Sequence, residues 1–474
     1  MKIILINPPM DFAVALGKAK GIAKYTAMMP SGLAYMAALL KKNNLDVQII
    51  DAYSLGLSIE RIVSQIDAAG TDIVGISCVT PTVPTVLSIA KRLKELNKNI
   101  LAVIGGFHAS ALPEDLLQYE YIDVVVRGEG ETTFMELVEA FRQKKSFSPI
   151  EGISFKENGG FIHNKNRSLF VDLDSLPLPA YELLPFHLYK APPHWAVKEP
   201  VAFIQISRGC PFNCTFCAVE ILGKKRRLRS MDSIFKEIDF LIEKFNARQI
   251  MFQDPDFPVE RKYALEFCNE AIKRGYSKRI VWTTSTRVDL VDEELLNKMY
   301  ESGCRIVNYG IESGVQEILD NVKKGFTVEK ARKSIKASSK SGIKNFATFI
   351  FGLPGDSRKT ILDTLKFAKE LDVDFAQFYI LVPYPGTALY KMLKKENKLP
   401  QRNWDDFLAM SSMTGIDPIF VPEGMTESEL KQLQKMAYHQ YYFRPRMMLR
   451  HLGNIHSVQD VVRYFDVAKA LLSI

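Results

Sequence analysis

Short apolar runs alternate with amphipathic segments along the first 145 residues. Apolar runs rich in β-branched residues predict strands at 2–6, 45–50, 72–76, 100–104 and 122–126. Helical spacing of apolar positions predicts helices over 31–43, 58–69, 82–96, 112–118 and 131–143. Five strand–helix repeats with short connections predict a doubly wound parallel sheet, covered by helices on both faces, over residues 1–145.

The rest of the chain divides into three further parts. Residues 146–198 predict a structured connector with a hairpin turning at Asn158-Gly159-Gly160. From 199 to 395 strands are expected at 202–207, 249–252, 279–284, 305–309, 345–351 and 375–382, with helical segments between them. Six repeats are too few for a closed eight-fold barrel, so we expect an open partial (β/α)6 barrel. Residues 396–474 predict a mainly helical tail.

The composition of the chain argues against several classes of protein. The chain has 474 residues, 47% hydrophobic and 24% charged, with a formal net charge of +8, which is modest for this size and does not establish nucleic-acid binding. The apolar run at the start is too short for a signal peptide, and we find no apolar run of the ~18 residues needed to span a bilayer. The six cysteines are not spaced as a disulfide framework. A reducing cytoplasm is the expected location.

The strongest chemical signal is the segment from Ser207 to Cys217. Its three cysteines, Cys210, Cys214 and Cys217, are spaced by three and then two residues and follow a predicted strand at the carboxyl end of the barrel. Three thiolates can bind an iron–sulfur cubane and leave its fourth iron open for catalysis. Structural zinc is the alternative, but zinc sites of this kind pair two short Cys/His motifs and no second pair follows.

This spacing matches the CxxxCxxC motif of radical S-adenosylmethionine (SAM) enzymes, and Phe216 matches their aromatic residue before the last cysteine. The resemblance implies a [4Fe–4S] cluster whose open iron chelates SAM, and cleavage of SAM to a 5′-deoxyadenosyl radical. It also implies SAM contacts in the loops after successive barrel strands. The usual GGE sequence is absent, so the residue at the SAM amino group is uncertain. The resemblance implies four SAM candidates: Asp254 for the amino group, Arg287 for the carboxylate, Glu312 for the ribose hydroxyls or the methionyl amine, and the backbone near Gly352 for the adenine.

The first domain resembles the Rossmann-like cobalamin-binding domain of cobalamin-dependent members of that family, and the whole resemblance covers about residues 1–390. Its carboxyl-end loops hold small residues that let a flat macrocycle approach the backbone. The DxHxxG loop that supplies histidine to cobalt in other corrinoid proteins is missing, so we expect cobalt without a histidine ligand. The cobalamin candidates are Pro8, Pro9, Ser31, Ser77, Gly105, Gly106, His108, Gly128 and Glu129.

Three further features of the sequence bear on its function. Transfer-RNA methylthiotransferases carry three cysteines before the barrel, whereas only Cys78 precedes it here. The basic run 224–229 predicts a solvated loop or a contact with an anionic substrate, rather than RNA binding. The tail segment 438–450 predicts a helix packed across the barrel with its arginines pointing outward, or else an apolar pocket or membrane-surface contact. Its Tyr-Phe-Arg-Pro sequence resembles a subgroup with the anaerobic Mg-protoporphyrin ester cyclase and hopanoid-pathway enzymes.

The resemblance implies radical modification of an unactivated carbon, with methyl transfer ranked first and radical cyclisation or another rearrangement second. A corrinoid-binding sensor or carrier without catalysis is the alternative from another class. The expected partners are a small-molecule substrate, with a lipid or a tetrapyrrole as candidates, and an external electron donor such as flavodoxin or ferredoxin. Nucleic acid is not expected. The expected location is cytoplasmic, with peripheral membrane contact as an open alternative.

Overall fold

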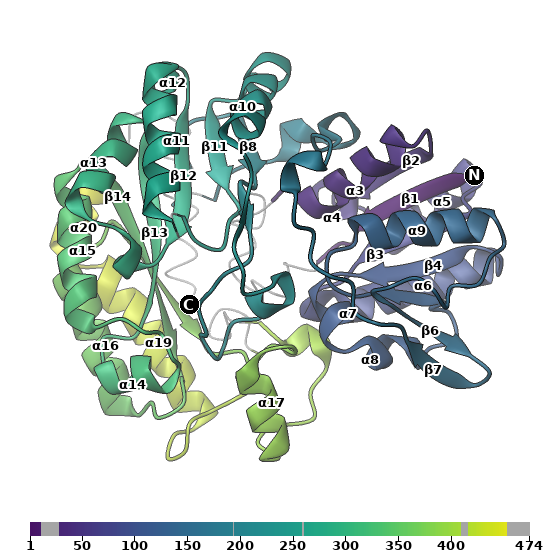
Figure 1. Ribbon diagram of the computed structural model, residues 1–474. Helices are drawn as coiled ribbons and strands as arrows, with labels where there is room; N and C mark the ends of the chain where they lie inside the picture. The colour runs from purple at the N-terminus through teal and green to yellow at the C-terminus, as the bar shows by residue number, and fades with distance from the viewer. Residues whose placement is uncertain (11–27, 193, 258–259, 409–415, 453–474) are drawn as a thin grey trace.

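The computed structural model describes residues 1–10, 28–192, 194–257, 260–408 and 416–452 (Figure 1). Two sheets organise these residues, one at each side of the view in Figure 1. The first has seven strands in the order β2-β1-β3-β4-β5-β6-β7. Its five parallel strands confirm the predicted ones: β1 Lys2–Asn7, β2 Asp46–Asp51, β3 Ile73–Ser77, β4 Leu101–Gly105 and β5 Val124–Val126.

Helices cover both faces of this first sheet, as the doubly wound prediction requires. Alternate strand residues point to opposite faces: Ile4 and Ile6 pack in one apolar cluster, whereas Ile3 and Leu5 pack in another. The first cluster includes residues of α5 (Ile59–Ala69) and α6 (Val83–Leu96), and the second includes residues of α3 (Ser31–Lys42) and α9 (Glu131–Arg142). The short helix α4 (Ala52–Leu55) follows β2.

The predicted helix over 112–118 is confirmed with slightly shorter bounds, and a short helix that was not predicted precedes it. The structure has α7 (Phe107–Ala111) and α8 (Pro113–Leu117), which meet at Leu112. Proline restricts the residue before it to non-helical conformations, and Leu112 accordingly has φ −136° and ψ 67°. Pro113 therefore begins a new helix.

The predicted hairpin in the connector belongs to the first sheet. Its strands, β6 (Ile153–Glu157) and β7 (Gly160–His163), are antiparallel, and β6 pairs with β5. The domain boundary at 145/146 stays a prediction, but the sheet itself runs beyond it. Three short 3₁₀ turns follow, at Leu173–Ser175, Tyr181–Leu183 and Phe186–Leu188.

The second sheet is the open barrel. All six strands are parallel, in the order β15-β14-β13-β12-β11-β8. They are β8 Val201–Ile204, β11 Gln249–Phe252, β12 Val281–Thr286, β13 Cys304–Glu312, β14 Lys344–Phe351 and β15 Phe375–Ile380. Helices alternate with them: α10 Met231–Phe245, α11 Arg261–Lys273, α12 Tyr276–Arg279, α13 Glu293–Glu301, α14 Gln316–Asn321, α15 Val328–Lys340, α16 Arg358–Leu371 and α17 Ala388–Lys395.

A helix of the C-terminal tail supplies hydrogen-bond partners for the backbone groups at one edge of this open sheet. Unpaired backbone groups on an edge strand invite aggregation, and β15 is such a strand. Helix α19 (Glu427–Tyr442) lies against it and supplies side-chain partners. The Tyr442 hydroxyl accepts from the Ala376 N–H at 3.0 Å and donates to the Ala376 carbonyl at 2.7 Å, and the Phe378 N–H donates to the Tyr438 hydroxyl at 3.2 Å.

The arginines after this helix do not all point outward. In α20 (Pro445–Leu452), Arg450 pairs with Asp372 at 2.6 Å, and Arg444, just before the helix, lies 3.7 Å from the same carboxylate. Only Arg446 is highly exposed, although it too contacts Asp372, at 3.0 Å. The predicted outward orientation is therefore wrong for Arg444 and Arg450. None of the described helices has the length and apolarity needed to cross a membrane.

Candidate functional site: a three-cysteine loop facing the first domain

A two-stranded ladder closes the loop that carries the three cysteines. Strand β9 (Ser207–Arg208) pairs antiparallel with β10 (Arg227–Leu228), so residues 209–226 form a closed loop after β8. Gly209 opens this loop at φ +88°, and a Cβ there would lie 2.3 Å from the Lys225 carbonyl oxygen. Only glycine fits this close approach of two backbone segments.

The three thiols differ in exposure. Cys210 is buried, with its sulfur 3.1 Å from Asp256 Oδ2, whereas Cys214 is half-buried and Cys217 is exposed. Burial raises the pKa of the Cys210 thiol, and the neighbouring Arg226 charge opposes that rise. Charge interactions also link Cys210 with both other cysteines. Thiolate is the metal-binding form, so Arg226 favours the state that a cluster needs.

The donor set fits an iron–sulfur cubane. Each thiolate of a cubane binds a different iron, so its ligands are spaced more widely than ligands around one ion. In the described residues no three His, Cys, Asp or Glu side chains are arranged around a single-ion site. The three sulfurs on one closed loop are the ligands that a cluster would take.

Arg287, after β12, lies against the cysteine loop. Its guanidinium carbon is 3.6 Å from the centre of the Phe212 ring, and its Nη1 donates to the Cys214 sulfur at 3.8 Å. Two further N–H groups donate to Asp289 at 2.9 Å, and Nη2 also donates to the Lys324 carbonyl at 2.6 Å. The planar guanidinium is therefore fixed beside the cluster position. Its predicted pairing with the SAM carboxylate stays a prediction.

Glu312 ends β13 in a buried ion pair. Its carboxylate lies 2.8 Å from the Lys324 ammonium, and both side chains are less than a tenth exposed. Glu312 has φ +71°, and a Cβ on Gly310 would lie 2.7 Å from the Glu312 carboxylate. The sequence named Glu312 but gave no sign of Lys324, which follows α14 twelve residues later.

Asp254 and Asp256, which follow β11, have different partners. Asp254 accepts hydrogen bonds from the Ile206 N–H at 3.1 Å and from the Ser207 hydroxyl, and burial raises its pKa to about 6. It thereby fixes the chain entering the cysteine loop. Asp256, which contacts Cys210 and pairs with Arg226, is the residue that sequence reasoning missed. Both lie in one Asp-Pro-Asp sequence, and nothing in that pattern shows which of them reaches the thiol.

Gly352 lies at the end of β14 with φ +82°. Its N–H donates to Asp356 Oδ2 at 3.0 Å, and a Cβ there would lie 3.1 Å from Leu430. Burial raises the pKa of Asp356 to about 6. The predicted approach of adenine to this backbone stays a prediction.

The basic run at 224–229 is not simply a solvated loop, so that interpretation needs correction. Arg226, Arg227 and Arg229 are each about 5% exposed or less at the side chain and form ion pairs with Asp256, Glu129 and Glu237 respectively. Burial with a carboxylate partner removes these three arginines from any RNA or substrate surface.

The predicted cobalamin residues gather at the carboxyl edge of the first sheet. Ser77 and Gly105 are register partners at the ends of β3 and β4, and Gly106 has φ +107°, where a Cβ would lie 2.7 Å from the Cys78 carbonyl. Gly128 is exposed after β5, and its N–H donates to the Ser110 hydroxyl at 2.9 Å. Pro8 is buried and Pro9 half-buried after β1.

Three of the polar candidates already have protein partners. His108 is buried, 3.3 Å from both Thr80 and Asp115, with its ring against Trp404 at 4.8 Å. The Ser31 hydroxyl donates to Gln253 after β11. The Glu129 carboxylate contacts Arg208 and Arg227. Their predicted roles toward cobalamin stay predictions.

These contacts bring the carboxyl edges of the two sheets face to face (Figure 1). The first residue of α3, Ser31, contacts the loop after β11, and the loop after β5 contacts β10 through Glu129. A Cβ on Gly386, after β15, would lie 3.1 Å from the Ala111 methyl in α7. Ligands of parallel sheets bind at this edge, so two ligand-binding edges meet at one interface.

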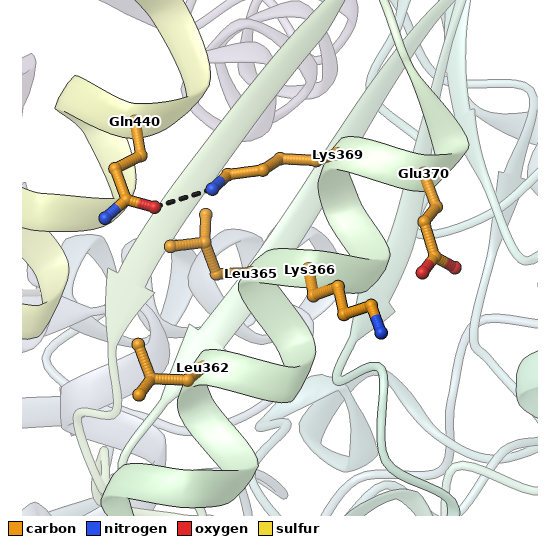
Figure 2. Close-up of a pocket in the computed structure, with 6 residues that line it drawn as sticks. All are labelled: Leu362, Leu365, Lys366, Lys369, Glu370 and Gln440. Atoms are coloured by element: carbon orange, nitrogen blue, oxygen red, sulfur yellow. Dashed lines mark hydrogen bonds between the residues drawn. The ribbon is translucent and has the colours of Figure 1, made fainter.

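A cavity of about 300 Å³ lies elsewhere, between α16 and α19 (Figure 2). Figure 2 shows Lys369 reaching Gln440, with Nζ 2.6 Å from Oε1. None of the predicted cluster, SAM or cobalamin residues lines it. Its lining residues are Leu362, Leu365, Lys366, Lys369, Glu370 and Gln440.

Comparison with known proteins gives two domain matches and close relatives. Residues 204–368 match the radical SAM superfamily, and residues 22–138 match the B12 binding domain. An uncharacterized methyltransferase of Pyrococcus horikoshii is 35% identical over 458 residues, covering 96% of this chain and 95% of that protein. The anaerobic magnesium-protoporphyrin IX monomethyl ester cyclase of Rubrivivax gelatinosus is 30% identical over 421 residues, covering 87% of this chain and 73% of the cyclase.

A solved structure shares the fold across the whole chain. The radical SAM methyltransferase TsrM from Kitasatospora setae, with cobalamin and a [4Fe–4S] cluster bound, matches with a TM-score of 0.74 at 17% identity, covering 100% of this chain and 99% of that one. At that identity the likeness concerns the fold alone.

Proposed function

Because this chain belongs to the family of radical SAM enzymes that carry a B12-binding domain, we propose that it transfers a methyl group to an unactivated carbon of a small organic molecule. The family uses a [4Fe–4S] cluster, SAM and cobalamin. The observation that carries the proposal is the contact between the carboxyl edge of the B12-binding sheet and the closed three-cysteine loop. This arrangement suits a reaction that needs both cofactors beside one substrate.

The chain's own residues have separable roles in this proposal. Cys210, Cys214 and Cys217 would hold the cluster, and Arg226 lowers the cost of the thiolate form at Cys210. Arg287, fixed by stacking and four hydrogen bonds, presents positive charge beside the cluster to a carboxylate. When bound, the cluster and SAM supply a 5′-deoxyadenosyl radical, and cobalamin supplies a methyl carrier.

In this proposal the substrate lies against polar side chains that point into the barrel. Ser285, Asn308, Thr348 and Gln377 occupy inward-facing register positions on β12 to β15 and are half-buried. Asn308 Oδ1 is buried and has no hydrogen-bond partner among the described residues. Buried polar atoms are normally paired, so the Asn308 oxygen favours a ligand that donates a hydrogen bond there.

Radical cyclisation without methyl transfer is the second candidate, favoured by the 30% identity to the ester cyclase. Near-complete coverage of the methyltransferase relative, 95% of its length, favours methyl transfer instead. A tetrapyrrole or a lipid remains our candidate substrate. The exposed apolar side chains Phe443, Met448 and Leu449 support a contact with a membrane surface or an apolar substrate.

The test is anaerobic reconstitution with iron, sulfide and hydroxocobalamin, followed by incubation with SAM that carries a deuterated methyl group. We expect 5′-deoxyadenosine, S-adenosylhomocysteine and a labelled product from candidate tetrapyrroles, lipids or peptides. A cyclase would release 5′-deoxyadenosine without transferring label, and a corrinoid sensor would release none. Cys214→Ala should abolish all products. Cys268→Ala, on the buried face of α11, is the matched control that should retain them.

The cellular setting is part of the proposal. Cys210, Cys214 and Cys217 form no disulfide, as is usual in a reducing compartment, so we place the reaction in the cytoplasm, with flavodoxin or ferredoxin as electron donor. Replacing chemical reductant by either protein should sustain turnover. Failure of both donors, with turnover intact on chemical reductant, would remove this part of the proposal.

A further inference from the structure

Four buried charged side chains join the first domain to the base of the cysteine loop. We call them the Glu–Arg network: Glu129 and Glu131 from the first domain, and Arg208 and Arg227 from the β9–β10 ladder. All four side chains are at most 8% exposed. Arg208 stands two residues before Cys210, and Arg227 is its cross-strand partner. The network therefore lies where the cluster-carrying loop begins and ends.

The contacts within the network are specific. Arg227 Nη1 lies 2.9 and 2.7 Å from the two carboxylate oxygens of Glu129, and Arg208 Nη1 lies 3.3 Å from one of them. Arg208 Nη2 donates to Glu131 at 2.6 Å. The Phe170 N–H donates to Glu129 at 2.8 Å, and Arg227 returns a bond to the Phe170 carbonyl at 2.8 Å.

These bonds use the acceptor capacity of Glu129. A carboxylate offers about four lone-pair positions, and Glu129 accepts four donor contacts: one from Arg227 to each oxygen, one from Arg208 and one from Phe170. A residue that contacts cobalamin would need one of them free. Gly128, one residue earlier, is exposed, and nothing lies within 4 Å of where its Cβ would be, so a flat ligand has room to approach there.

We propose that Glu129 is a positioning residue, which fixes the cysteine loop against the B12-binding sheet rather than contacting cobalamin itself. The proposal deepens and rests on the proposed function, because it concerns how the two cofactor edges keep one geometry. Glu131 supports the same role through Arg208. Arginine suits position 227 because Nη1 bonds to Glu129 and to the Phe170 carbonyl while Nη2 donates to the Leu222 carbonyl at 2.6 Å. Lysine has only one nitrogen and would lose the second set of bonds.

The first test uses protein without cofactors. Hydrogen exchange of peptides covering residues 207–228 should become about ten-fold faster in Glu129→Gln, because the arginines lose their charged partner. Peptides of β13, in the centre of the barrel, should exchange as in the wild type. Asp123→Asn is the matched control: Asp123 precedes the same strand β5, pairs with Lys94 at 2.6 Å, and touches nothing in the network. It should leave the 207–228 peptides unchanged.

The second test uses loaded enzyme and magnetic resonance. In the wild type, the reduced cluster and cob(II)alamin should show one defined spin–spin interaction. Glu129→Gln should spread it over several distances, whereas a residue with only a general stabilising role would leave it defined. If Glu129→Gln does not fold, Arg227→Lys is measured instead by the same two criteria.

Two outcomes would overturn the proposal. One is unchanged exchange of the 207–228 peptides together with weaker cobalamin binding, which would make Glu129 a corrinoid contact. The other is unchanged exchange with an unchanged spin–spin interaction. The exchange result does not depend on turnover. Absence of methyl transfer in the wild type would therefore refute the proposed function without touching this assignment.

Discussion

Replacing Gly209 by alanine should prevent the cysteine loop from closing. The added Cβ would lie 2.3 Å from the Lys225 carbonyl oxygen and 3.0 Å from the Gly223 carbonyl oxygen, whereas ordinary contacts begin at 3.4 Å. Both neighbours are backbone atoms, so relief requires the two sides of the loop to separate by about 1 Å. That separation breaks the β9–β10 ladder, which has only two residue pairs.

The stability that Gly209→Ala should lose has two parts. An alanine at φ +88° costs about 1–2 kcal/mol in backbone strain, and the backbone clash brings the total to about 3–5 kcal/mol. Gly159→Ala isolates the first part, because Gly159 has φ +78° in the β6–β7 hairpin with nothing within 4 Å of its Cβ. The control should therefore lose only about 1–2 kcal/mol.

The assay is iron and sulfide content after anaerobic reconstitution, with thermal stability measured beside it. Gly209→Ala should bind little iron, and Gly159→Ala should bind as much as the wild type. Full iron content in Gly209→Ala, with a loss of stability no larger than that of Gly159→Ala, would refute the reasoning about the closed loop.

Three further predictions follow from the geometry. Arg287→Lys keeps the charge but loses the planar guanidinium, so calorimetry on reconstituted enzyme should show an affinity for SAM at least about ten-fold lower than that of the wild type. An unchanged affinity would contradict the role of Arg287. Tyr442→Phe leaves the Ala376 N–H and carbonyl on the β15 edge without the Tyr442 hydroxyl. This loss should lower the free energy of unfolding by about 1–3 kcal/mol and promote aggregation, as measured by thermal melting and light scattering. Equal melting curves would argue against this role of Tyr442. Burial lowers the pKa of His194 to about 4. Below about pH 6.5 the unfolded chain binds a proton at His194 that the folded protein does not bind. The free energy of unfolding therefore falls as the pH is lowered from 6.5 toward 4, by about 2 kcal/mol at pH 5. His194→Phe, which suits the neighbouring Phe346 ring 4.5 Å away, should remove that part of the acid sensitivity, and parallel pH–melting profiles would disprove the assignment.

The order of strands and helices could be read from the sequence because apolar periodicity is local. Each parallel strand of the first sheet packs on helices of both faces, so both sets of alternate residues are apolar and the strand is visible in the sequence as a short continuous apolar run. The start of the predicted helix over 112–118 also has a local cause, since proline begins a new helix at Pro113. The hairpin was visible as well, but its attachment to β5 was not, because strand pairing depends on contacts distant in sequence.

The partners of the site residues could not be predicted for the same reason. Glu129 and Arg227 are 98 residues apart, and Cys210 and Asp256 are 46 apart. Composition counts the arginines of the basic run but cannot show that three of them are buried with carboxylates. The cysteine spacing was informative because its three ligands lie on one short loop, where chain geometry alone keeps them together.

The most direct test of the account is the Mössbauer spectrum of protein reconstituted anaerobically with ⁵⁷Fe, recorded before and after SAM is added. We predict about four irons per chain in one cubane, with a single iron site altered by SAM and all iron lost when Cys210, Cys214 and Cys217 are replaced by alanine together. Tetrahedral zinc in place of iron, or an unchanged spectrum in the triple variant, would contradict it.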